Sequence, residues 1–329
     1  MTYKMLTERE AAKIIAGAEC ADIAVHASPD ADTLGCALAL SAMINGNGGD
    51  ARVVSSDPIP EYLRFLTEGV TLGDELRLGA EHISVDVASP PQLGRFSGLR
   101  DSFSLMIDHH GRGEMFADGV VEGDAAACGE IVFRIVGILR DEYGWSVPAP
   151  VPSYLYAAVS GDTGSFRFSN TTPETHRIAA ALHEMGADTV RIAHNLHSVK
   201  TPGECRAHRL GLENMEFFLD GKLVITSATA EELAGNDIAP GDFSEADGMR
   251  SVLGALVGVS LKETEPGVWR ASTRANVPVD CSAVCALWGG GGHTAAAGCT
   301  IHAESRAEAV KLIKEPFSEA IRAYEHGKE

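Results

Sequence analysis

The sequence predicts an α/β protein, in which a domain with a doubly wound, mostly parallel sheet precedes a second, smaller α+β domain. Short segments rich in Val and Ile alternate with longer apolar-faced segments in the first half of the chain. This alternation is typical of parallel strands joined by helices. Aromatic residues are sparse at 6%, whereas glycine occurs 35 times, which favours close helix packing over a β-sandwich. A chain of 329 residues is long enough for two domains.

The first domain is expected at residues 1–190. Residues 1–20 form a charged amphipathic pattern, which indicates a helix rather than a signal peptide. Strands are expected at 22–27, 51–56, 82–88 and 103–108, and helices at 32–46, 126–144, 152–160 and 172–187. Ligands of parallel sheets bind outside the carboxyl ends of the strands. Polar residues that follow these strands are therefore the first candidates for a site.

A polar helical connection is expected at 191–222, and the second domain at 223–329. Its strands are expected at 222–229, 253–263 and 267–275, and its last helix at 305–327. The residues TEPG separate the second and third of these strands, which predicts a hairpin.

The formal net charge of −19 argues against binding to long duplex nucleic acid, because such a chain repels polyanions. A small anionic substrate remains compatible with this charge if cations are bound at the site. Seven scattered cysteines indicate reduced thiols and a cytoplasmic protein, and Cys281 and Cys285 are interpreted as core residues. Since no apolar run approaches the ~18 residues of a membrane span, no membrane association is expected. The sequence leaves a monomer and a homodimer both open.

Acidic and histidine side chains follow several elements of the first domain. They are His26, Asp30, Asp32, Asp86, Asp108, His109, His110 and Asp162. Singly, each has an ordinary explanation: Asp32 precedes an apolar helix and is a good N-cap candidate, and His26 is compatible with a satisfied core histidine. Together, these carboxylates would repel one another at one sheet edge unless cations lie between them.

Imidazole and carboxylate ligands suit Mn²⁺, Zn²⁺ or Fe²⁺, and a carboxylate-rich set favours Mn²⁺ or Mg²⁺. The number of candidates is sufficient for two divalent cations that share one carboxylate. Two metals about 3.5–4 Å apart can activate water and clamp an in-line phosphoryl displacement. The pattern therefore favours a metal-dependent phosphoesterase.

The second domain contains the segment WGGGGHTAAAG, in which four glycines precede His293. Backbone N–H groups of Gly290, Gly291 and Gly292 are candidates to bind a phosphate, because no side chains obstruct its approach. His293 and Arg274 would add donors to the same anion. The alternatives are a plain glycine loop and an exposed arginine at a strand end.

The ordered segments HASPDAD, SVDVAS, DHH, SGDTGSFRFSN and GGGGHTAAAG resemble the DHH phosphoesterase superfamily. The resemblance spans residues 20–302 and is greatest to the stand-alone nano-RNase and pAp phosphatase type. That type has a DHH catalytic domain followed by a DHH-associated domain. The active site is then expected in the cleft between the two domains, completed by closure.

The resemblance also implies a role for each candidate. His26 and Asp30 would bind one metal, whereas Asp32, His109 and Asp162 would bind the other. Asp86 would bridge the two metals. Asp108 would orient its neighbours, and His110 would lie beside the scissile phosphate as a catalytic group. Arg274, His293 and the glycine backbone would hold the substrate phosphate, whereas Arg112 receives no role.

The function expected from this resemblance is a two-metal phosphohydrolase. It would cleave short single-stranded oligonucleotides of about two to five nucleotides and dephosphorylate pAp. The metal is expected to be Mn²⁺, with Mg²⁺ and Co²⁺ as alternatives. Alternative substrates are another small phosphate ester, a cyclic dinucleotide or a short polyphosphate. Outside enzymes, the alternative is a non-catalytic metal or nucleotide sensor.

Overall fold

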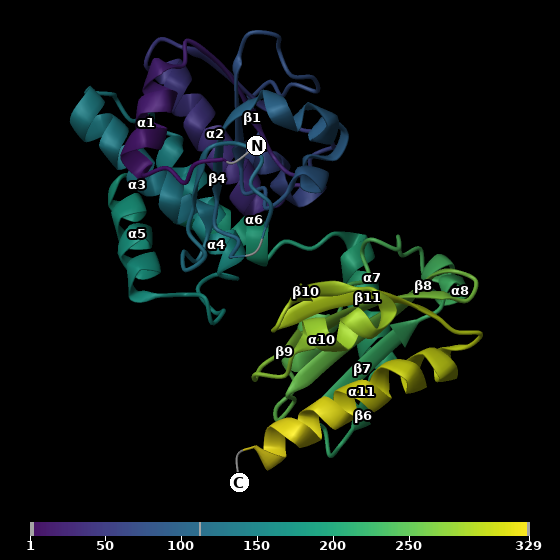
Figure 1. Ribbon diagram of the computed structural model, residues 1–329. Helices are drawn as coiled ribbons and strands as arrows, with labels where there is room; N and C mark the ends of the chain where they lie inside the picture. Colours follow the sequence, from purple (N-terminus) through teal and green to yellow (C-terminus); the bar gives the residue numbers. More distant parts are fainter. Residues whose placement is uncertain (1–2, 112, 328–329) are drawn as a thin grey trace. The chain divides into compact units, whose positions relative to one another are not determined.

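The computed structural model describes residues 3–111 and 113–327, so Arg112 lies outside the described residues. The chain divides into two compact units, residues 1–199 and 200–329. The first contains a parallel sheet with helices and the second a mixed sheet with helices, which confirms the predicted fold class (Figure 1). The boundary falls within the predicted connection at 191–222: helix α6 (Thr189–His197) belongs to the first unit and helix α7 (Pro202–Glu213) to the second.

The sheet of the first unit has the strand order β2-β1-β3-β4-β5 in the described part of the chain, and every neighbouring pair is parallel. Its strands are β1 (Cys20–Ala24), β2 (Asp50–Val54), β3 (Glu81–Val85), β4 (Phe103–Asp108) and β5 (Gly119–Val121). Its helices are α1 (Glu8–Gly17), α2 (Ala31–Gly46), α3 (Cys128–Tyr143), α4 (Val151–Asp162), α5 (Pro173–Glu184) and α6 (Thr189–His197). Two 3-10 segments, η1 (Glu61–Leu66) and η2 (Pro90–Ser102), also belong to this unit.

Apolar side chains cover both faces of this sheet. On one face, Ile23, Ile83 and Ile107 pack in the main core together with α1, α2, α3 and α4. Helix α2 is buried along nearly its whole length because it contacts the strands on one side and α4 on the other. The opposite face carries a smaller core that includes Phe103 and Phe116. Burial on both faces explains why these strands read as almost continuous apolar runs.

Three strands end earlier than the sequence predicted. β1, β2 and β3 stop at Ala24, Val54 and Val85, although they were expected to reach residues 27, 56 and 88. Left-handed backbone at Asp86, with φ of 57°, interrupts the predicted extension of β3, and Ser28, just beyond the predicted end of β1, has the same φ. His26 and Asp86 consequently lie beyond the ends of β1 and β3.

The N-cap of α2 is Asp30 and not Asp32, which corrects the prediction. The Asp30 carboxylate accepts hydrogen bonds from the backbone N–H groups of Asp32 and Thr33. Asp32 is the second helical residue, so its carboxylate is free to turn towards other parts of the unit.

The described part of the second unit has a sheet of order β10-β11-β9-β8-β7-β6, in which only β7 and β8 pair in parallel. Its strands are β6 (Glu216–Phe218), β7 (Leu223–Ala228), β8 (Val257–Glu265), β9 (Val268–Ala275), β10 (Gly291–His293) and β11 (Ala296–His302). Its helices are α7 (Pro202–Glu213), α8 (Ala230–Gly235), α9 (Ala246–Arg250), α10 (Cys281–Cys285) and α11 (Arg306–His326), with the 3-10 turn η3 (Ala286–Trp288). The predicted hairpin is confirmed as the β8–β9 pair.

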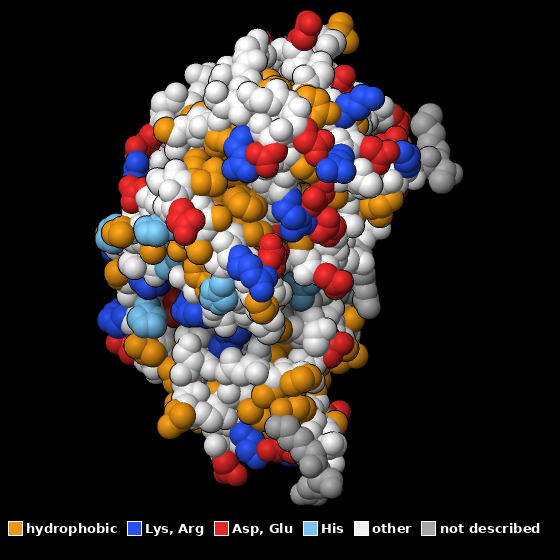
Figure 2. Space-filling model, turned by 90° about the vertical axis from the view of Figure 1, so that its left-hand side faces the viewer, with side chains coloured by type: hydrophobic (Ala, Val, Ile, Leu, Met, Phe, Trp, Pro, Cys, Tyr) orange, Lys and Arg blue, Asp and Glu red, His pale blue; other side chains and the backbone are white. Residues whose placement is uncertain are grey.

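Helix α11 lies along the sheet of the second unit (Figure 1) and packs Ile313 and Phe317 into its core. Cys281 and Cys285 are buried in the same core, which confirms their interpretation as core residues. Among the described helices, none combines the length and the apolarity that crossing a bilayer requires. Figure 2 shows a face on which histidine, basic, acidic and apolar side chains are intermixed.

Candidate metal centre

The carboxyl edge of the first sheet brings together all six candidate ligands of the first unit. They arrive from the loops after β1 and β3, the first turn of α2, the end of β4 and the end of α4. Ligand atoms lie within 4.8 Å of one another in three overlapping groups: His26, Asp30 and Asp86; Asp32, His109 and Asp162; and Asp86, His109 and His110. Residues separated by more than a hundred positions thus converge on one small volume.

His26 forms the first group with two carboxylates. Its Nε2 lies 3.6 Å from Asp30 Oδ1 and 3.5 Å from Asp86 Oδ2. Its Nδ1 lies 2.8 Å from the carbonyl oxygen of Ala27, which favours a proton on Nδ1. Nε2 is then the nitrogen that faces the carboxylates, and it can bind a metal ion that takes the place of its proton.

His109 forms the second group. Its Nε2 lies 3.2 Å from Asp162 Oδ2 and 3.8 Å from Asp32 Oδ2, and its Nδ1 lies 3.2 Å from the carbonyl oxygen of Ala125. Asp32 is fully buried and is held at the start of α3. The backbone N–H groups of Cys128 and Gly129 donate to its two oxygens over 2.7 and 2.9 Å.

Asp86 lies between the two groups and presents one oxygen to each. Oδ2 faces His26, whereas Oδ1 lies 3.5 Å from His109 Nε2 and 3.6 Å from His110 Nδ1. The side chain is 2% exposed, and Oδ1 makes no hydrogen bond to any described residue. A buried carboxylate oxygen without a hydrogen bond is costly. The residues present therefore fit a cation on each side of Asp86.

Burial and the excess of negative charge both shift the pKa values of the aspartates in this cluster. Burial, with the charge of Asp86 next in size, raises the pKa of Asp32 well above its usual range. Burial also raises the pKa of Asp86, to about 6, with Asp30 and Asp162 adding to it against the opposing contact with His26.

The histidines respond to the same negative potential. Burial acts to lower the pKa of His26, but its contacts with Asp30 and Asp86 raise it to about 11. Burial opposes the rise in the pKa of His109 as well, and the contact with Asp162 and the nearby charges bring it to about 10. A site that draws protons onto imidazoles in this way has the potential that attracts a divalent cation.

The remaining members of the DHH triplet are also at this edge. His110 Nδ1 lies 2.8 Å from Asp108 Oδ1, and this hydrogen bond raises the pKa of His110. Asp108 is 1% exposed, and its Oδ2 makes no hydrogen bond within residues 3–111 and 113–327. Asp108 is thus placed to orient the His110 ring, while His110 itself has ligand-forming distance to Asp86 and His109.

Sequence reasoning missed two contributors to this edge. The backbone amides of Cys128 and Gly129 donate to Asp32. The sequence could have indicated this contact, because the N-cap of α3 is Ala127, which has no capping side chain, so the first amides of the helix need another acceptor. Asn170 donates to the backbone at the end of α4, although the motif that contains it had suggested no role for it. The contacts with Asp32 span 96 and 97 positions of the chain, and the contact of Asn170 with Asp162 spans eight.

In the second unit, Arg274 and His293 lie in one row across three strands. Ala296 of β11 pairs with Arg274 of β9 on one side and with His293 of β10 on the other. Directly paired residues of antiparallel strands have their side chains on the same face of a sheet, so the two predicted donors share one face. Arg274 Nε also lies 3.4 Å from Asp247 Oδ2.

Packing accounts for part of the glycine run. A Cβ on Gly290 would lie 2.3 Å from the carbonyl oxygen of Gly298, and one on Gly292 would lie 2.5 Å from that of Ala296. Gly292 also has φ of 141°. A Cβ on Gly291 would meet no atom within 4 Å, so close packing does not explain this glycine. Its exposed backbone remains the candidate contact for an anion.

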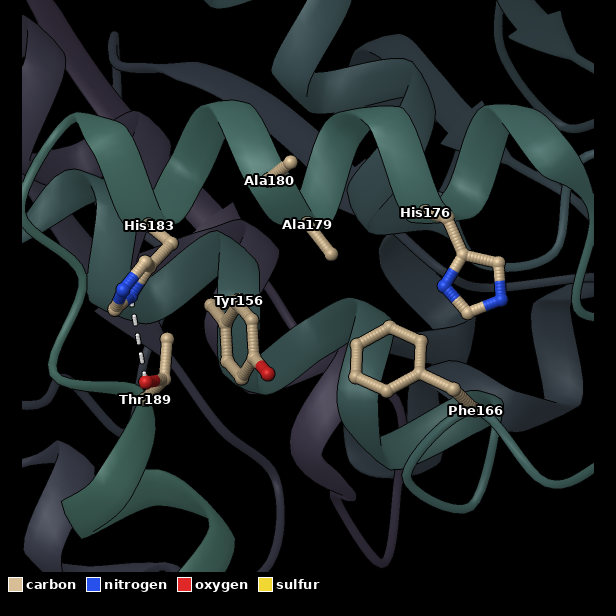
Figure 3. Close-up of a pocket in the computed structure, with 7 residues that line it drawn as sticks. All are labelled: Tyr156, Phe166, His176, Ala179, Ala180, His183 and Thr189. Atoms are coloured by element: carbon tan, nitrogen blue, oxygen red, sulfur yellow. Dashed lines mark hydrogen bonds between the residues drawn. The ribbon is translucent and has the colours of Figure 1, made fainter.

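A pocket of about 340 Å³ lies on the first unit between α4, α5 and the start of α6. Its lining residues are Tyr156, Phe166, His176, Ala179, Ala180, His183 and Thr189. Figure 3 shows the Phe166 and His176 rings at one end, with His183 and Thr189 at the other. Phe166 follows Asp162 closely in the chain, and its ring packs against Tyr156 and His176 with centroid distances of 5.8 and 5.6 Å. These ring contacts hold Phe166, which follows the metal centre in the chain, against α4 and α5.

Comparisons with known proteins support the same grouping. Residues 221–319 match the model of the DHHA1 domain. The bifunctional oligoribonuclease and PAP phosphatase NrnA of Thermus thermophilus is 32% identical over 304 residues, which cover 91% of this chain and 89% of that protein. The protein of the same description from Bacillus subtilis is 23% identical over 291 residues, covering 87% of this chain and 90% of its own length.

A solved structure agrees at the level of the fold. The crystal structure of an exopolyphosphatase-related protein from Bacteroides fragilis has a TM-score of 0.85, with 22% identity and 96% coverage of both chains. The motifs, the convergence of their side chains and the relatives lead to one conclusion. This chain belongs to the DHH phosphoesterase family, in the group of bifunctional oligoribonucleases and PAP phosphatases.

Proposed function

We propose that this protein is a two-metal phosphohydrolase that cleaves short oligonucleotides and dephosphorylates pAp. The observation that carries the proposal is the position of Asp86, whose two oxygens face two different groups of ligand-forming side chains. The relatives from Thermus thermophilus and Bacillus subtilis, which are bifunctional oligoribonucleases and PAP phosphatases, support the substrate class.

We propose that His26 and Asp30 hold one cation, that Asp32, His109 and Asp162 hold the other, and that Asp86 contacts both. When bound, two divalent cations would activate water at neutral pH and neutralise charge on the phosphoryl group. Mn²⁺ is the proposed metal because the set combines imidazoles with several carboxylates, and Mg²⁺ and Co²⁺ are its alternatives.

The DHH triplet would work beside these ligands. Asp108 fixes the ring of His110 through the 2.8 Å contact with Nδ1. The other ring nitrogen, Nε2, is then the atom of His110 that would meet the substrate phosphate and hold or move a proton there. In this role the raised pKa of His110 favours the charged imidazolium, which binds an anion and donates a proton.

The second unit would hold the terminal phosphate of the substrate. Arg274 and His293 share one face of its sheet, and the backbone of Gly290, Gly291 and Gly292 lies in the strand pair beside them. Small anions fit this arrangement better than long polyanions, because the net charge of the chain is −19. The cleft between the units, the cytoplasmic location and the choice between monomer and homodimer stay predictions.

A substrate panel tests the proposal. Purified protein is stripped of metal, supplied with Mn²⁺, Mg²⁺ or Co²⁺, and assayed on pAp, a linear dinucleotide, a pentanucleotide, a cyclic dinucleotide and a short polyphosphate. We expect turnover of pAp and the linear oligonucleotides, with the highest rate in Mn²⁺. Preferential turnover of polyphosphate or the cyclic dinucleotide would contradict the proposed substrates. Binding of nucleotide and metal without any turnover would indicate a sensor instead.

A further inference from the structure

We propose that Asn170 is a positioning residue for one of the two cation sites, because it ties the backbone of Asp162 to the segment that holds Asp32 and His109. This inference rests on the proposed function, since it concerns the same centre. It assigns to Asn170 a role in metal affinity rather than contact with the substrate.

Asn170 uses both hydrogens of its side-chain amide. Nδ2 donates to the carbonyl oxygen of Ala126 over 2.9 Å and to that of Asp162 over 3.1 Å. An amide nitrogen has two donors, so the group is fully used by these two carbonyls. The first carbonyl precedes α3, and the second belongs to the last residue of α4.

The segment 125–129 contacts the other two members of the same group. The carbonyl oxygen of Ala125 faces Nδ1 of His109 at 3.2 Å, which leaves Nε2 towards Asp162. The amides of Cys128 and Gly129 bind the two oxygens of Asp32. Asn170 connects the same segment to Asp162, because its amide donates to the carbonyl oxygens of both Ala126 and Asp162. One short segment thus aligns a histidine and two aspartates from three different elements.

The chain turns sharply in order to bring Asn170 back to Asp162. Gly164, Ser165 and Phe166 are three successive residues with φ of 54°, 59° and 62°. Ser165 and Phe166 are strained there, since left-handed backbone is costly for residues other than glycine. A Cβ on Gly164 would also lie 2.3 Å from the ring of Phe168. Strain of this kind persists where the surrounding structure requires the geometry.

Contacts within the turn hold this geometry. The hydroxyl of Thr163 donates to the carbonyl oxygen of Val159 over 2.6 Å and accepts from the backbone N–H of Phe166 over 3.1 Å. Thr163 is fully buried, whereas Asn170 is exposed. Substitution of Asn170 therefore opens no cavity in the core and is expected to leave the fold intact.

The alternative role of Asn170 is to cap the end of α4, because it satisfies one of the last carbonyls of that helix. A cap alone would affect thermal stability and leave the affinity for metal unchanged. The two roles therefore differ in a measurable quantity that does not depend on turnover.

The test compares Asn170→Asp and Asn170→Ala with the wild type by calorimetric titration of Mn²⁺ into metal-free protein. Asn170→Asp removes both donors at almost constant shape and adds a negative charge, which by itself would strengthen cation binding. The matched control is Asn195→Asp, because Asn195 Nδ2 donates to the carbonyl oxygen of Arg191 within α6. We expect two Mn²⁺ ions in the wild type and the control. In both Asn170 variants we expect one ion to bind about 10- to 100-fold more weakly and the other to be unchanged.

Absorption spectra of the Co²⁺-loaded proteins provide the second readout, because they report the coordination geometry. A changed spectrum in the Asn170 variants and an unchanged one in the control would support the inference. Folded Asn170 variants that bind both ions with wild-type affinity would overturn it and leave Asn170 as a helix cap. Loss of the fold in both variants would overturn it as well. A wild type that binds no Mn²⁺ would refute the proposed function and this inference together.

Discussion

Two buried aspartates of the first unit show how the same residue type can serve opposite purposes. Asp22 lies in β1 and Asp86 directly follows β3, and the two side chains are 0% and 2% exposed. Asp22 accepts hydrogen bonds from Nε of Arg52 over 2.9 Å and of Arg77 over 2.8 Å. Asp86 has histidines and other carboxylates around it instead.

The pKa values express this difference. Burial acts to raise the pKa of Asp22, but hydrogen bonds from Arg52 and Arg77 outweigh it and hold the pKa below its ordinary value. The pKa of Asp86 is raised to about 6 because burial and neighbouring carboxylates dominate. The counter-charges of Asp22 are guanidiniums, which do not lose their protons, whereas the groups beside Asp86 are imidazoles, which can release a proton when a metal ion binds. Burial alone therefore does not identify a site; the lack of a fixed counter-charge does.

The largest expected effect in this comparison is on turnover. Asp86→Ala should lower kcat/KM for pAp with Mn²⁺ by about a thousandfold or more, because metal stabilisation of the transition state amounts to several kcal/mol. The control is Asp101→Ala, which removes an exposed carboxylate. Equal rates for the wild type and Asp86→Ala would contradict the role proposed for Asp86.

Asp22→Asn should lower the free energy of unfolding and leave turnover unchanged. Neutralising one partner of a buried ion pair costs about 3 kcal/mol of unfolding free energy, and here it leaves the guanidiniums of Arg52 and Arg77 without their shared carboxylate. Urea denaturation measures the change. Under conditions where it is fully folded, the variant should keep the kcat and the Mn²⁺ affinity of the wild type. A large loss of kcat under these conditions would show that Asp22 also affects the metal centre.

The increase in thermal stability on Mn²⁺ binding should differ between the Asp22 and Asp86 variants. Mn²⁺ at a hundred times its Kd should stabilise the wild type by about 2.7 kcal/mol for each ion bound, since it binds the folded state. Asp22→Asn should retain this increment although its baseline is lower, and Asp86→Ala should lose most of it. Calorimetric melting curves with and without a chelator provide the measurement. The same increment in all three proteins would place the metal outside the proposed centre.

The smallest expected effect is a pH dependence that belongs to Asp22. Because its folded pKa is depressed, its stabilising contribution is complete above the unfolded value near 3.9 and is lost as pH falls through the folded pKa. The loss is at most about 1.4 kcal/mol per pH unit for one group. Denaturation of metal-free wild type and Asp22→Asn from pH 6 down to pH 2.5 should show the two stabilities converging in acid. A constant difference over this range would exclude the proposed linkage.

The sequence predicted those features that depend on local pattern or on the topology of a parallel sheet. β4 was predicted with its observed bounds, because its apolar run ends where its ladder ends. The convergence of His26, Asp86 and His109 followed from the rule for carboxyl ends of strands. The end of β3 was predicted too late, because left-handed backbone at Asp86 leaves no trace in the apolar pattern.

The choice between neighbouring caps and the contacts between distant groups were not predictable in this way. Asp30 caps α2 because the helix begins at Ala31, so the amide of Asp32 is itself one of the two that Asp30 binds. The link from Asn170 to Ala126 spans 44 residues and depends on how α3 and α4 pack. The glycines at 290 and 292 were interpreted through anion binding, whereas their packing against β11 becomes visible only in three dimensions.

The turn at Gly164–Phe166 also limits which insertions and deletions the chain can accept. Asn170 donates to the carbonyl oxygen of Asp162, eight positions earlier in the chain. Three left-handed residues between them turn the chain back towards Asp162. Adding or removing one residue would carry the amide away from both of its carbonyls, whatever the side chains in between. Surface loops usually vary in length among related proteins. This one should vary in composition while its length stays fixed.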